Sequence, residues 1–253
     1  MLEYLDLPYV FPENEAQKLD IFTPDQGGFS TLIWFHGGGI VSGSRKGNDI
    51  PCGLVKKGIA VVAAEYRMYP TAKFPDFIVD AANAVAFTVK KIKELGGNGK
   101  VFIGGSSAGA YLTMMLCMNK DFLKNAGVNE ELDITGFISD SAQTFTHFNV
   151  LKEMGMDSRI QYIDQKAPIS FINSALTLRP LLMFYYSKDM VCRPEENKLF
   201  YASLKRFLPD SDVTLTELEG THCSADYPDQ NGDRRIEPYL FDFISKYEQS
   251  EPA

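Results

Sequence analysis

Short apolar runs that favour β-strands alternate along the chain with longer stretches of helical periodicity. Residues 31–35 are almost continuously apolar, which is typical of a strand covered on both faces. Between residues 76 and 95 apolar side chains recur on one helical stripe, and the glycine-rich run 96–99 ends it. Further strands are predicted at 18–23, as an edge strand, and at 60–67, 101–104, 134–138, 180–186 and 213–218.

This alternation predicts an α/β fold with a mostly parallel central sheet and helices on both faces. Ligands bind outside the carboxyl ends of such strands, so functional residues are expected there. Residues 143–178 contain no convincing strand, only partly amphipathic helix with several aromatic residues. We therefore expect residues 1–253 to form a single domain, with 143–178 as a short helical insertion, or lid, after the sixth strand and over the active site.

Composition and charge limit the classes of function that are expected for this chain. The chain has 253 residues, 45% of them hydrophobic, which is enough for one large core. The net charge is -8 and the 25 Lys and Arg residues form no cluster, so nucleic acid is not expected as a partner. The start of the chain lacks the pattern of a signal peptide, and no apolar run approaches the roughly 20 residues that span a bilayer. We expect a cytoplasmic protein without membrane association.

The four cysteines are widely scattered and have no C-x-x-C spacing. This pattern indicates neither a zinc site nor a disulfide framework, so free thiols are expected. No cluster of ligand residues suggests a metal, and neither a metal nor an organic cofactor is expected.

The run Gly105-Ser106-Ser107-Ala108-Gly109 lies between a predicted strand and a predicted helix. A Gly-x-Ser-x-Gly elbow places its serine on a sharp strand-to-helix turn, where Oγ projects into a cleft. The small flanking residues allow the backbone to turn that tightly. Ser107 is therefore the candidate nucleophile.

A second motif, His36-Gly37-Gly38-Gly39, directly follows the strand at 31–35. Three consecutive glycines allow backbone N–H groups to turn towards a ligand. Acyl transfer requires such donors, because the oxygen of the tetrahedral intermediate becomes negative. The N–H groups of Gly38 and Gly39, with that of Ala108 after the candidate nucleophile, are the predicted oxyanion hole.

The ordered motifs His36–Gly39, Glu65–Pro70, Phe74-Pro75 leading into Asp80-Ala81, and Gly105–Gly109 resemble those of α/β-hydrolase esterases of the hormone-sensitive-lipase-like and acetyl-esterase-like (BD-FAE-like) group. The resemblance covers nearly the whole chain and implies an α/β-hydrolase fold with a serine esterase activity. Two positions depart from it, since many members have Asp where this chain has Ser106 and Gly where it has Ala110. The N-terminal segment is too short for the large helical cap of lipase-like members, which points to small, soluble acyl groups.

A serine nucleophile needs a base, and the chain has three histidines. His36 lies in the glycine loop, where we expect it to brace that loop. His147 lies in the insertion, with no strand end to fix it. His222 follows the last predicted strand, at the expected carboxyl edge, and the resemblance also places the base there. His222 is therefore the predicted base.

The acid is expected between the serine and the histidine in the chain, at a strand end. Asp189, after the strand at 180–186, fits this position. Asp140 is the rival, although a residue at such a position more often caps a helix or satisfies loop amides. Glu217 and Glu219 are too close to the base on its own strand. Asp189 is the predicted acid, with the role of orienting His222.

These parts predict a carboxylic-ester hydrolase of short-chain, acetyl-like esters that works through a Ser-Asp-His triad and an acyl-enzyme. Acetylated sugars, general short-chain esters and formamides remain open as substrates, and the alternatives are an arylformamidase-type amide hydrolase or a non-catalytic binding module. The expected partner is a small-molecule ester; the oligomeric state is left open, with a homodimer paired at an exposed edge strand as one option. The insertion is expected to supply pocket walls from Phe145, His147, Phe148, Tyr162 and Phe171.

Overall fold

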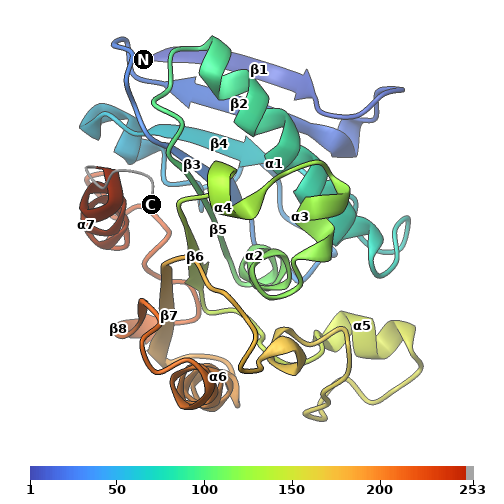
Figure 1. The fold of residues 1–253 in the computed structure, drawn as a ribbon. Helices are drawn as coiled ribbons and strands as arrows, with labels where there is room; N and C mark the ends of the chain where they lie inside the picture. The colour runs from blue at the N-terminus through green and yellow to red at the C-terminus, as the bar shows by residue number, and fades with distance from the viewer. Residues whose placement is uncertain (249–253) are drawn as a thin grey trace.

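The computed structural model describes residues 1–248 and is built on an eight-stranded sheet in the order β1-β2-β4-β3-β5-β6-β7-β8 (Figure 1). The pairs β1–β2 and β2–β4 are antiparallel, and all the other neighbours are parallel. The strands are β1 (Leu2–Pro8), β2 (Lys18–Thr23), β3 (Thr31–Phe35), β4 (Ala60–Ala64), β5 (Val101–Ser106), β6 (Gly136–Asp140), β7 (Leu181–Lys188) and β8 (Val213–Thr221).

Helices connect the parallel strands. They are α1 (Asp76–Glu94), α2 (Ala108–Met118), α3 (Asp121–Asn125), α4 (Glu130–Asp133), α5 (Phe148–Glu153), α6 (Arg193–Phe207) and α7 (Glu237–Glu248). Short 3-10 turns lie at Glu15–Gln17, Cys52–Lys57 and Pro168–Phe171. The predicted mostly parallel sheet with helices on both faces is confirmed.

The prediction of an edge strand at 18–23 is wrong, because β1 pairs with β2 and forms the edge itself. The sequence gives little sign of β1, since most of its side chains are exposed and show no apolar alternation. Its register shifts between Tyr4 and Leu7, and Asp6 between them has φ 54°. The strand is therefore held by backbone pairing more than by burial.

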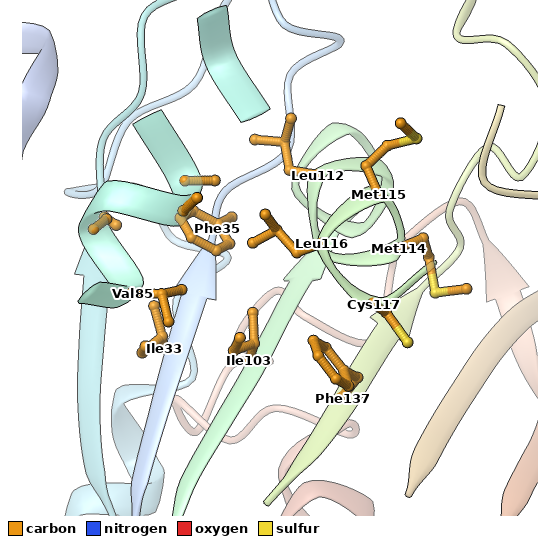
Figure 2. Close-up of a cluster of buried hydrophobic side chains, with 14 of the residues drawn as sticks. Ile33, Phe35, Val85, Ile103, Leu112, Met114, Met115, Leu116, Cys117 and Phe137 are labelled. Atoms are coloured by element: carbon orange, nitrogen blue, oxygen red, sulfur yellow. The ribbon is translucent and has the colours of Figure 1, made fainter. Parts of the chain in front are cut away.

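The sheet carries a separate hydrophobic cluster on each face. On β3, Ile33 and Phe35 point into one cluster while Leu32 and Trp34 point into the other, as expected from the period of two along a strand. Helices α1, α2 and α6 cover the first face, and α7 with the 3-10 turn at 52–57 covers the second. Figure 2 shows how the side chains of α2 pack onto those of β3, β5 and β6.

Between β6 and β7 the chain forms α5 and the turn Pro168–Phe171, and the described residues there include no strand. This is the region that the sequence marks as an insertion over residues 143–178. The division of the chain into one domain with that insertion stays a prediction. No helix within residues 1–248 has both the length and the apolar content that crossing a membrane requires.

The carboxyl ends of the parallel strands meet at one edge of the sheet. His36 directly follows β3, Ser107 follows β5, and Ser141 follows β6. Asp189 follows β7 and His222 follows β8. These five residues are distant in sequence but reach one edge, because each directly follows one of five consecutive strands of the sheet.

A pair of buried acids lies beneath this edge. Asp140 and Asp226 are both 0% exposed, and one ligand atom of each, with Cys223 Sγ, lies within 4.8 Å of the others. Tyr186 donates its hydroxyl to Asp140 Oδ2 at 3.0 Å. Burial raises the pKa of Asp140 to about 6. Burial, and then the charge of Asp140, raise the pKa of Asp226 well above its ordinary range. Two adjacent carboxyl groups without a cationic partner favour a shared proton at neutral pH.

Replacing Asp226 should make the stability of the fold less sensitive to pH. Because both pKa values are raised, protonation of the pair stabilises the folded state fully below the unfolded pKa of about 4, and this stabilisation starts to be lost as pH rises through about 6, where Asp140 ionises. Asp226→Asn removes one titrating group and the repulsion. The fall in melting temperature between pH 5 and pH 8 should therefore shrink by several degrees relative to wild type, equivalent to about 1–2 kcal/mol.

Asp210, which is exposed, supplies the matched control as Asp210→Asn and should leave the wild-type pH dependence unchanged. Thermal unfolding followed by circular dichroism at both pH values is the measurement. An equal fall for Asp226→Asn and wild type would show that the pair does not share a proton.

Candidate active site

Ser107 occupies the turn between β5 and α2. Its φ of 52° and ψ of -108° are strained for a residue with a side chain. A Cβ on Gly109 would lie 1.9 Å from the carbonyl oxygen of Phe35, so only glycine allows α2 to start this close to β3. The N–H of Ser107 donates to the carbonyl oxygen of Asp140 at 2.8 Å. The elbow is therefore fixed by a close contact with the end of β3 and by a hydrogen bond to the end of β6.

Ser107, His222 and Asp189 form one chain of hydrogen bonds. Nε2 of His222 lies 2.8 Å from Oγ of Ser107. Nδ1 of the same ring lies 2.5 Å from Oδ1 of Asp189. The side chain of Asp189 is fully buried, whereas that of His222 is 23% exposed. The structure thus brings together the three residues that the sequence predicts as nucleophile, base and acid.

The carboxylate of Asp189 is held by several donors. Burial raises its pKa, but hydrogen bonds from His222 and Ser141 outweigh this, so the pKa of Asp189 lies below its ordinary value. The backbone N–H groups of Met190 and Tyr186 also donate to it, at 2.7 and 3.1 Å. The group is therefore an ionised acceptor at neutral pH.

Ser141 is a member of this site that sequence reasoning missed. Its Oγ donates to Oδ2 of Asp189 at 2.6 Å and lies 3.0 Å from Nδ1 of His222. Its φ is 55°, and its carbonyl oxygen accepts from the buried Arg193 guanidinium at 2.6 Å. The only sequence signal is its place, one residue beyond the end of β6.

The rival acids have other partners. Asp140 belongs to the buried acid pair and accepts from Tyr186; within residues 1–248 it has no hydrogen bond to His222. Glu217 accepts from the Tyr185 hydroxyl at 2.8 Å. Neither carboxylate is placed to orient the His222 ring.

The glycine loop after β3 is braced by His36. Its Nε2 lies 2.8 Å from Oε1 of Glu65, and its ring stacks on Tyr66 with centroids 4.5 Å apart. Gly38 has φ 107°, and a Cβ there would lie 2.0 Å from the carbonyl oxygen of Ser42. The loop thus needs glycine at this position, and His36 is occupied within it.

Asp49 ties the glycine loop to the elbow. Its Oδ2 accepts from the N–H of Gly37 at 2.9 Å and from the hydroxyl of Ser106 at 3.2 Å. One carboxylate oxygen therefore links Gly37 in the glycine loop to Ser106, the residue before the candidate nucleophile.

The backbone N–H groups of Gly38, Gly39 and Ala108, the predicted oxyanion donors, have no hydrogen-bond acceptor in the part of the chain that the structure describes. Gly38 and Gly39 line the same cavity as Ser107. Asn149 fixes the loop from the opposite side by donating Nδ2 to the carbonyl oxygen of Gly39 at 2.6 Å.

The site opens into a cavity of about 470 Å³. Its lining residues come from the glycine loop, the elbow, α5 and the loops after β7 and β8: Gly37, Gly38, Gly39, Val41, Ser106, Ser107, Phe148, Asn149, Lys152, Met190, His222, Cys223 and Tyr227. A larger hollow of about 570 Å³ lies beside residues 24–29, which lead into the amino end of β3, and contains none of these residues.

Of the predicted pocket residues, only Phe148 lies in this wall; Tyr162 and Phe171 do not. Phe145 and His147 are buried and stay outside it. His147 stays outside the wall because its own contacts hold it in the interior. Its Nδ1 accepts from the N–H of Asn149 and so caps α5, and its ring packs between Tyr111 and Phe148. Burial holds the pKa of His147 well below its usual range, so the ring is neutral.

Comparisons with known proteins agree on the fold. A probable isoprenylcysteine alpha-carbonyl methylesterase of Oryza sativa subsp. japonica is 31% identical over 107 residues, covering 41% of this chain and 25% of that protein. An AB hydrolase superfamily protein of Schizosaccharomyces pombe is 34% identical over 97 residues, covering 37% and 28%. The crystal structure of esterase B from Lactobacillus rhamnosis superimposes with a TM-score of 0.78 at 15% identity, covering 98% of this chain and 86% of that one.

The chain thus has the α/β-hydrolase fold, although it spans only about a quarter of the length of these two curated relatives. The sequence model of one family, BD-FAE, matches residues 19–204, which include the glycine loop, the elbow and Asp189. With nearly three quarters of its residues inside that match, the chain belongs to the BD-FAE family.

Proposed function

We propose that this protein is a serine carboxylic-ester hydrolase that acts on short-chain, acetyl-like acyl esters. The observation that carries the proposal is the unbroken hydrogen-bonded chain from Ser107 through His222 to Asp189, which opens into a cavity beside unpaired N–H groups. An alcohol is a weak nucleophile at neutral pH, and this arrangement supplies both the base and the group that orients it.

In the first half-reaction Oγ of Ser107 attacks the ester carbonyl carbon, and Nε2 of His222 takes the hydroxyl proton. The carbonyl π electrons move onto oxygen, which becomes the oxyanion. When the intermediate collapses, the bond from carbon to the leaving oxygen breaks, and His222 donates its proton to the departing alcohol. The acyl group remains on Ser107.

In the second half-reaction water replaces the alcohol. His222 takes a proton from the water as its oxygen attacks the acyl carbon, and then returns that proton to Oγ of Ser107 as the acid leaves. The net change is one ester and one water converted to one alcohol and one acid. This scheme requires neither a metal nor an organic cofactor.

The N–H groups of Gly38, Gly39 and Ala108 are the proposed donors to the oxyanion. Each such donor lowers the barrier by about 3 kcal/mol in acyl-transfer enzymes, because it is already oriented when the charge develops. Asn149 and the Asp49 bridge would keep this loop in place before substrate arrives.

Ser141 is proposed as a positioning residue for the acid. Its hydroxyl donates to Oδ2 of Asp189, and Oδ1 of the same carboxylate accepts from Nδ1 of His222. Because Ser141 Oγ also lies beside Nδ1, it offers a second acceptor when the ring becomes positive. The base would thus keep one tautomer and one orientation.

The names of the compared proteins support ester chemistry, since one is a probable methylesterase and another an esterase. A cavity of about 470 Å³ is near the lower end of pockets for small ligands, which favours a short acyl group. A small-molecule ester is the proposed partner, while cytoplasmic location, lack of membrane or nucleic-acid association, and a homodimer paired at the edge of the sheet stay predictions.

Replacing Ser107 should abolish ester hydrolysis. On p-nitrophenyl esters of rising acyl length, wild-type kcat/KM is expected to peak at acetate or butyrate. Ser107→Ala should lower it by at least about 10³-fold, because residual catalysis would come from binding and the oxyanion donors alone. Wild type and variant equally inert on every ester would count against the proposal, and an N-formyl arylamine assayed in parallel would then test the amide-hydrolase alternative.

The two rival aspartates can be separated by matched amide variants. Asp189→Asn is expected to lower kcat for p-nitrophenyl acetate by roughly 10³- to 10⁴-fold, because the amide favours the wrong tautomer of His222. Asp140→Asn changes the same group on the neighbouring strand and should keep kcat within about tenfold of wild type. The reverse order of effects would assign the acid to Asp140.

A further inference from the structure

Lys152 is the one Lys, Arg, Asp or Glu among the described residues that line the active-site cavity. It lies in the last turn of α5, exposed to solvent. Every other side chain of the wall is apolar, aromatic, amide, hydroxyl or thiol, apart from the imidazole of His222. The cavity therefore presents one permanent charge to a ligand, and that charge is positive.

Helix α5, which carries Lys152, is held against the glycine loop of the candidate active site. Asn149 donates to the carbonyl oxygen of Gly39, and Phe148 stacks on the buried His147 ring with centroids 4.3 Å apart. Lys152 follows Phe148 by one turn on the same face, and its Nζ lies 5.5 Å from the Phe148 ring centroid. The stem of Lys152 thus starts from a fixed base and extends along the cavity wall.

Lys152 has no carboxylate partner within residues 1–248. The adjacent Glu153 is engaged elsewhere, since it accepts from the Tyr69 hydroxyl at 2.6 Å and from the N–H of Phe74 at 3.0 Å. The chain as a whole has a net charge of -8, so its general field repels anions. A cation that lies over an aromatic ring and has no carboxylate partner can bind a negative group of a ligand in the cavity.

We infer that the natural substrate is an ester whose alcohol part carries an anionic group, for which a carboxylate serves as the probe, and that Lys152 is the residue that selects it. The inference rests on the proposed function. The charge belongs to the alcohol part because a short acyl group offers no place for it. An exposed cation and an anion several ångströms apart interact weakly, so the expected preference is about three- to fivefold in kcat/KM.

Two acetyl esters of equal size test this inference: 4-acetoxybenzoate, which is an anion, and 4-acetoxybenzamide, which is neutral. Lys152→Gln should lower kcat/KM for the benzoate about three- to fivefold, mainly through KM, and leave the benzamide within twofold. Lys152→Glu should lower the benzoate value further. High salt should shrink the difference between wild type and Lys152→Gln, because screening weakens an exposed ion pair.

The matched control is Lys90→Gln, which removes an exposed lysine from α1 and should leave the benzoate-to-benzamide ratio unchanged. A ratio that is the same in wild type, Lys152→Gln and Lys152→Glu would overturn the inference. If the wild type hydrolyses the benzamide, Ser107→Ala does not, and the ratio is insensitive to Lys152, only the substrate class is refuted. If wild type and Ser107→Ala are equally inactive on both esters, the proposed function fails and the inference fails with it.

Discussion

The start of helix α2, at Gly109, lies so close to the end of strand β3 that no side chain fits between the two backbones there. A Cβ on Gly109 would lie 1.9 Å from the carbonyl oxygen of Phe35 and 2.7 Å from that of His36. Because the chain must turn from β5 into α2 at this contact, Ser107 takes a strained conformation and projects its hydroxyl. The same approach places the first N–H of α2 next to the glycine loop. One backbone contact thus positions the candidate nucleophile and the candidate oxyanion donors together.

Two aspartates on adjacent strands differ in charge because their neighbours differ. Asp189 is surrounded by donors, including His222 and Ser141, and its pKa is lowered. Asp140 is fully buried and faces the carboxyl group of Asp226, and its pKa is raised to about 6. The fold therefore keeps a negative charge behind the His222 ring and removes one of the two negative charges of the acid pair beneath it. Hydrogen-bond donors, and not the residue type, decide which carboxylate can orient the base.

The strand ends could be predicted from the sequence because buried parallel strands are continuous apolar runs, and the residue after each run reaches the same edge. This was enough to single out Ser107, Asp189 and His222, which the structure brings into contact. Ser141 could not be found in this way, because a serine after a strand is common and its value depends on a partner 48 residues away. Strand β1 was missed because its side chains are mostly exposed, so no apolar pattern marks it. The pocket wall was predicted only at Phe148, since an aromatic residue near α5 can equally face the core.

The bridge made by Asp49 constrains which residues can stand beside it. Its Oδ2 accepts from both Gly37 and Ser106 in a largely buried position, so the neighbour at 106 has to be a donor. An aspartate at 106, which the resemblance finds in many related esterases, would bring two carboxylates together there. Positions 49 and 106 are therefore expected to change together among relatives, with the acid on one side and a donor on the other. A sequence that carries acids at both positions would need a proton or a cation between them to keep the glycine loop joined to the elbow.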